Sequence, residues 1–195
     1  MKKYFEICVC LYFVIVYNLI KQKRLLKEEA KKSGKVKEKK AADNILKQLK
    51  NTARGAGAFT NKDGLQVIGG AFSAVRLKKP LPVENLPKNI NPIDYDPIFK
   101  KGEENEGDPL LLPSISELSA YIKAEKAAHK GEKNYIIFWS FGELLPVVNA
   151  IYLLDILYLL PDSVCIPSKR GILEALYFKS NNGDAILCPI RKPQK

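Results

Sequence analysis

The side chains that could do chemistry in this sequence are few and far apart. His129 is the single histidine among 195 residues, and the four cysteines form no Cys-x-x-Cys pair. Structural zinc sites need four cysteine or histidine ligands at short spacings, which this sequence does not offer. Cys165 and Cys188 could form a disulfide or stay as two reduced thiols. We therefore expect no metal and no cofactor.

An enzyme reading of this sequence depends on Ser140, Glu143 and His129. A serine, a carboxylate and a histidine act together only if the fold brings them into one pocket. Glu143 follows an apolar run and is predicted to start a helix, where the helix dipole favours a negative charge. We therefore expect a capping carboxylate at Glu143 and an exposed, helix-terminal His129. No residue is assigned as catalytic.

Two other segments resemble ligand loops in composition but lack the required spacing. Residues 55–59, GAGAF, have neither the G-x-G-x-x-G order nor the Gly-Lys-Ser/Thr ending of a phosphate loop. The acidic residues between Asp94 and Asp108 lack the order of an EF-hand. We interpret the first as a glycine linker and the second as solvent-exposed charge.

The net charge of +11 is concentrated in one segment. Residues 21–50 contain 12 basic and 4 acidic residues, whereas residues 51–195 contain 18 and 16. The basic segment contains no aromatic residue on which a base could stack, so nucleic-acid binding through residues 21–50 stays an alternative and not the main prediction. An anionic membrane surface is the favoured partner, and Lys21 to Lys40 would contact it.

The basic segment follows an apolar run at residues 7–20, ICVCLYFVIVYNLI. As a helix the run would be about 21 to 24 Å long, shorter than the roughly 30 Å hydrocarbon layer. It ends without the small residues of a signal-peptidase site, and lysines flank it on both sides. We predict an uncleaved anchor over residues 1–20, with an uncleaved signal as the other interpretation. The ten basic residues from Lys21 to Lys40 place the following domain on the cytoplasmic side.

Residues 51–113 are rich in glycine and proline and are predicted to form a connector with short strands. Apolar runs at 65–68 and 71–77, separated by glycines, predict two strands or a hairpin. Seven prolines then fall between Pro80 and Pro113, which requires extended or turning backbone. This span is either a strap over the domain or a linker to it.

Clearer patterns begin at Ser114. The Ser114-Ile-Ser-Glu117 capping box predicts a helix to about Lys130. Residues 135–141 are typical of a buried strand, and residues 143–160 of a largely buried helix with Asn149, Tyr152 and Asp155 on one face. A membrane crossing by residues 135–160 is disfavoured by Glu143 and Asp155. Asn182-Gly183 predicts a hairpin with strands at 174–179 and 185–190.

The order helix, strand, helix, hairpin over residues 114–190 resembles part of the thioredoxin fold. FWSFGELLP at 138–146 is similar to the strand-to-helix corner of that family, and FKSNNGD to its last hairpin. The resemblance implies a site at this corner, but Gly142, Glu143, Leu144 and Leu145 stand where the family has Cys-x-x-Cys. Dithiol chemistry would therefore be absent.

Together these patterns predict an α/β or α+β fold: a small mixed sheet, two packed helices and a C-terminal hairpin in residues 114–195, after an N-terminal membrane helix and a basic helix. The favoured function is a membrane-anchored binding or assembly protein with a protein partner. The alternatives are a degenerate thioredoxin-like or other enzyme, and a nucleic-acid binder.

Overall fold

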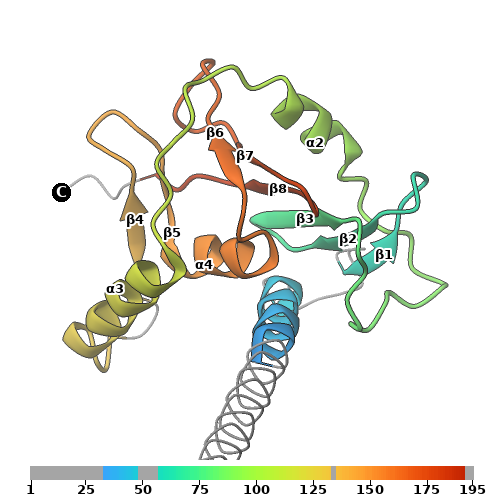
Figure 1. The fold of residues 1–195 in the computed structure, drawn as a ribbon, viewed down its shortest axis with the longest axis horizontal. Helices are drawn as coiled ribbons and strands as arrows, with labels where there is room; N and C mark the ends of the chain where they lie inside the picture. The colour runs from blue at the N-terminus through green and yellow to red at the C-terminus, as the bar shows by residue number, and fades with distance from the viewer. Residues whose placement is uncertain (1–32, 48–56, 133–134, 192–195) are drawn as a thin grey trace, which may run out of the picture. The chain divides into compact units, whose positions relative to one another are not determined.

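A six-stranded antiparallel sheet organises the part of the chain that the computed structural model describes, which is residues 33–47, 57–132 and 135–191. The strand order is β1-β2-β3-β8-β7-β6 (Figure 1). The predicted strand pair is confirmed as β2 and β3, and the predicted hairpin as β7 and β8. The strands are β1 (Ala58–Thr60), β2 (Gln66–Gly69), β3 (Ser73–Leu77), β6 (Val164–Ile166), β7 (Leu176–Ser180) and β8 (Gly183–Leu187).

Alternation along the strands gives the sheet two apolar faces, because successive side chains point to opposite sides. One face carries Ile68, Val75 and Phe178, all fully buried. The other carries a smaller cluster that includes Ala74 and Ile186. Three of the six strands of this sheet come from the segment interpreted as a connector. The described residues from 38 onward form one compact unit.

Helices cover both faces of the sheet (Figure 1). The helix α2 (Asp96–Glu103) covers the smaller face through Phe99. The larger face carries α4 (Ala150–Leu159), with α3 (Ile115–Ala128) packed beside it, and residues 38–47 of an N-terminal helix add Ala41, Ala42 and Ile45 to the same core. None of the helices in the described ranges is long and apolar enough to cross a bilayer. The predicted anchor at 1–20 lies outside those ranges.

The proline-rich span protects both edges of the sheet. At the β1 edge, the Leu86 amide donates to the Ala58 carbonyl at 2.8 Å. At the β6 edge, the Leu110 amide donates to the Cys165 carbonyl at 2.9 Å. Exposed strand edges invite pairing with other chains, so this span acts as a strap that caps them. Of the two interpretations of the span, the strap matches these contacts.

The helix predicted from the capping box is confirmed as α3. The Ser114 hydroxyl accepts a hydrogen bond from the Glu117 amide at 3.1 Å, as an N-cap does. The helix ends at His129, and Gly131 follows with a φ of 100°. Its buried residues are Leu118 and Ile122, which belong to the main core.

The prediction for residues 135–160 was wrong in the length of the strand, in the start of the helix and in the place of Glu143. The strand is shorter, β4 (Phe138–Ser140), and half-buried to exposed. The predicted helix from Glu143 starts at Ala150, because Val147–Asn149 forms a second strand, β5, paired with β4 in a separate two-stranded sheet. Asn149 is the N-cap of α4, with its side chain accepting from the Ile151 amide. Glu143 therefore lies in a hairpin loop and caps no helix.

These corrections fix the fold class as α+β. The strand at 138–140 does not share a sheet with the C-terminal hairpin, as the thioredoxin resemblance implies, and the main sheet is antiparallel and larger than expected. The hairpin strands are displaced from the predicted ranges, since Ser180 pairs with Gly183 and the two-residue loop is Asn181-Asn182. The basic helix is described over residues 33–47, and Gly34 lies within it.

Candidate functional site

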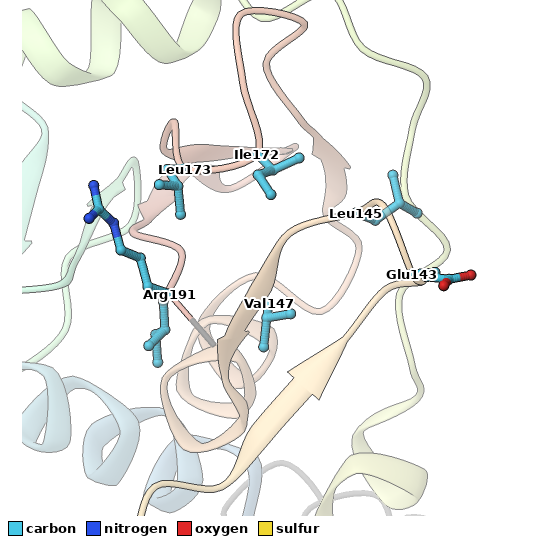
Figure 2. Close-up of a pocket in the computed structure, with 7 residues that line it drawn as sticks. Glu143, Leu145, Val147, Ile172, Leu173 and Arg191 are labelled. Atoms are coloured by element: carbon cyan, nitrogen blue, oxygen red, sulfur yellow. The ribbon is translucent and has the colours of Figure 1, made fainter. Parts of the chain in front are cut away.

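An apolar hollow of about 440 Å³ lies between the β4–β5 loop and the β6–β7 loop. Leu145 and Val147 come from the first side, and Ile172 and Leu173 from the second (Figure 2). Its described lining is Glu143, Leu145, Val147, Ile172, Leu173, Ile190 and Arg191. We call this hollow the apolar groove.

Local backbone features position the β4–β5 side of the groove. The chain turns at Gly142, whose φ of 155° side chains rarely adopt, and the Ser140 hydroxyl donates to the Gly142 carbonyl at 2.9 Å. Pro146 follows the turn, and the Phe141 amide donates to its carbonyl. The floor is anchored where the Ile190 amide donates to the Val147 carbonyl at 2.7 Å. These hydrogen bonds fix the backbone of the β4–β5 loop, and the loop presents its leucine side chains at the surface.

The rim of the groove exposes more apolar surface than a solvated loop needs. Of the groove's lining residues, Leu145 is 39% exposed, Ile172 is 56% exposed and Leu173 is 47% exposed. Contiguous exposed apolar residues with charged neighbours are typical of interaction sites. Glu143 and Arg191 supply those charges at opposite ends of the groove (Figure 2).

The residues of the enzyme hypothesis are not brought together by hydrogen bonds in the described chain. His129 Nδ1 lies 2.9 Å from Glu132 Oε1, and its ring stacks on Tyr135 with centroids 3.7 Å apart. The Ser140 hydroxyl donates to the Gly142 backbone, and Glu143 lines the groove. Among the described residues, Glu143 forms no hydrogen bond to Ser140 and no ion pair with His129. The described residues also contain no cluster of three or more metal-ligating side chains.

Neither of the two described cysteines is an activated thiol. Cys165 and Cys188 are not bonded to each other, and Cys165 is fully buried. Burial raises the pKa of the Cys165 thiol to about 12 and also raises that of Cys188. A thiol needs a lowered pKa to be a good nucleophile at neutral pH, so we assign neither a reaction.

A buried charged cluster on the α2 face was not predicted from the sequence. Arg76 Nε donates to Asp184 Oδ1 at 2.9 Å, and its Nη2 contacts both Asp184 Oδ2 and Glu103. The Tyr177 hydroxyl donates to Asp184 Oδ2 at 2.9 Å. The guanidinium also lies 4.1 Å from the ring centre of Phe99. These contacts join α2 to strands β3, β7 and β8.

The electrostatics of this cluster fit a structural role. Burial by itself would lower the pKa of Arg76, but hydrogen bonds to Asp184 and Glu103 outweigh it and raise that pKa above its usual value. Burial and then the Asp184 charge raise the pKa of Tyr177. The Arg76 and Asp184 side chains are each 12% exposed. Both side chains are therefore largely shielded from solvent.

Compared with protein-family models, curated proteins and solved structures, the chain matches none.

The sequence analysis did not predict the apolar groove. The helix predicted over residues 143–160 included Leu144 and Leu145, whereas Ile172 and Leu173 belong to none of the predicted elements. One signal could have found the second pair: two large apolar residues follow the polar turn SKRG and precede the strand run without belonging to an alternating pattern. Such apolar residues in loops are candidates for contact with a partner.

Proposed function

We propose that this protein is a membrane-anchored binding module whose apolar groove takes an extended apolar segment of a partner protein. The observation that carries this proposal is the groove itself, a hollow of about 440 Å³ rimmed by exposed leucine and isoleucine side chains. Its volume falls within the roughly 300 to 1,000 Å³ of ordinary binding pockets. Its described lining offers Glu143 and Arg191 as the charged groups and no nucleophile.

The charges select one kind of occupant. A segment with apolar side chains in its middle would bury them against Val147, Ile172 and Leu173. An acidic residue at one end would then meet Arg191, and a basic residue at the other would meet Glu143. Charges at the rim set orientation and partner choice more than affinity, while the apolar centre supplies most of the binding energy.

The membrane part of the proposal is supported by the sequence. The apolar run at residues 7–20 and the ten basic residues from Lys21 to Lys40 are the pattern of an anchor with a lipid-facing flank. Such a tether would confine the groove to a layer near the bilayer, where a partner in or on the same membrane is met at raised effective concentration. The domain would lie on the cytoplasmic side.

The groove is tested with an array of short peptides that differ in apolar content and in the sign of their flanking charges. We expect the full-length chain, in mild detergent, to retain apolar peptides with an acidic residue at one end and a basic residue at the other. Leu173→Asp should weaken this binding at least tenfold, because burying a leucine contributes about 1.5 to 3 kcal/mol. Binding is measured by fluorescence anisotropy of the selected peptides.

Two variants make the test specific. Leu111→Asp alters a leucine that is 93% exposed and does not line the groove, so it should bind as the wild type does. Arg191→Glu should change the preferred flank from acidic to basic at that end. Equal loss of binding in Leu111→Asp and Leu173→Asp, or no selection of apolar peptides, contradicts the proposal.

The anchor is tested separately by fractionation. The full-length chain should stay with the membranes after carbonate extraction, whereas a chain starting at residue 21 should be released. Recovery of the full-length chain in the soluble fraction would rule out the anchor and leave the groove proposal standing.

A further inference from the structure

A carboxylate is buried where residues 38–47 pack against α4. Asp155, in the middle of α4, is 4% exposed. Its Oδ1 accepts a hydrogen bond from Asn44 Nδ2 at 3.0 Å. Its Oδ2 is buried without a hydrogen-bond partner. Burying a charged carboxylate with one neutral donor is costly, whereas burying the neutral acid is much cheaper.

The surrounding elements do not neutralise this carboxylate. Lys40 on the N-terminal helix and Lys126 on α3 act on Asp155 through their charges, but both are exposed and neither forms an ion pair with it among the described residues. Tyr152 on α4 is affected in return, since burial and then the Asp155 charge raise its pKa. The sheets packed against α4 contribute apolar side chains to this core: Val148, Ala185 and Leu187.

The interface itself depends on small, closely packed residues. Ala41 is 1% exposed, and Ala42 and Ile45 are fully buried in the core that contains Ile156 and Leu153 of α4. Asn44 lies on the same helix and supplies the one hydrogen bond that Asp155 accepts. Undocking residues 38–47 would therefore return the Asp155 carboxylate to water.

We propose that Asp155 is a proton-controlled latch: with its proton it holds residues 38–47 on α4, and without it that helical segment undocks far more readily. This inference does not depend on the proposed function. The latch sets how firmly residues 38–47 are held on the rest of the domain.

The direction follows from the two protonation equilibria. Burial raises the pKa of Asp155 to about 7, against the downward pull of the Asn44 hydrogen bond and the two lysines. In the undocked state the carboxyl would titrate near the usual value of about 4. Docking is thus strongest below about pH 4, weakens as the pH rises from there to about 7, and is constant above that.

Hydrogen exchange on the full-length chain tests the latch. Protection factors of the amides of residues 41–46, corrected for intrinsic exchange, should fall about 100-fold between pH 5 and pH 8. At pH 8 these amides should also be at least tenfold less protected than those of β7 and β8, because the segment opens without the sheet. A change below threefold, or equal protection of segment and sheet at pH 8, overturns the proposal.

Two variants separate the latch from a general loss of stability. Asp155→Asn keeps the side-chain size and the acceptor for Asn44 but cannot ionise, so the 100-fold change should disappear. Asn44→Ala removes the one donor to the charged form, so the loss of protection at pH 8 should exceed that of the wild type. It gives a second reading should Asp155→Asn fail to fold. Asp155→Asn with the wild-type pH dependence would assign the effect to another group.

Discussion

Replacing Arg76 with methionine is expected to lower the free energy of unfolding by about 3 to 5 kcal/mol, because it leaves a buried carboxylate without its cation. Asp184, 8% exposed, would keep the Tyr177 hydroxyl as its partner. Glu103 is 47% exposed in its side chain and can turn to water, so it adds little to the loss. Urea unfolding followed by circular dichroism measures the change.

A matched control and a second substitution identify the cause. Lys179 is an exposed cation on β7 whose register partner is also Asp184, so Lys179→Met should change stability by less than about 0.5 kcal/mol. Adding Asp184→Asn to Arg76→Met should recover part of the loss, because the uncompensated charge is then gone. If the double variant is no more stable than Arg76→Met, the loss comes from packing against Phe99 and not from the charge.

The elements that the sequence predicted well are those whose signals are local. The α3 helix follows from a hydroxyl and a glutamate three residues apart, and the β7–β8 hairpin from Asn182-Gly183 between alternating runs. The β2–β3 pair likewise follows from short apolar runs separated by glycines. In each case the residues that specify the element lie within it or beside it.

The errors occurred where distant contacts decide the structure. The apolar pair Leu144-Leu145 extended the helical pattern of α4 backwards, although Val147 and Val148 favour a strand once β4 is beside them to pair with. The Arg76–Asp184 and Asn44–Asp155 contacts join residues 108 and 111 positions apart, so no local pattern marks them. The groove likewise needs the two loops to meet in space.

The strand order of the sheet also explains the role of the proline-rich strap. The sequence could identify seven prolines between Pro80 and Pro113 but not the sheet edges along which they run, since β1 and β6 begin 106 residues apart, at Ala58 and Val164. Edge capping by Leu86 and Leu110 becomes visible only when the strand order is known. Extended backbone of this kind suits the task because prolines limit its freedom to pair further.

Replacing Gly183 with alanine is the second change with a large expected effect, a loss of at least about 3 kcal/mol. Gly183 opens β8 and pairs with both Leu77 and Ser180. A Cβ at this position would lie 1.9 Å from the backbone oxygen of Arg76, and the φ of 151° is one that side chains rarely adopt. Since that oxygen belongs to the neighbouring strand, relief requires the β3–β8 pairing to shift.

Gly64→Ala separates the steric clash from the backbone strain. Gly64 also has a positive φ, 76°, but a Cβ there would meet no atom within 4 Å. Gly64→Ala should therefore lower the free energy of unfolding only by the cost of the backbone conformation, about 1 to 2 kcal/mol. Equal losses in the two variants, measured by urea unfolding, would mean that the β3–β8 pairing yields easily at Gly183. A larger loss at Gly183 would show that the close approach of β8 to β3 in the centre of the sheet does not tolerate a Cβ. This contact lies beside the Arg76 cluster, which joins α2 to the sheet.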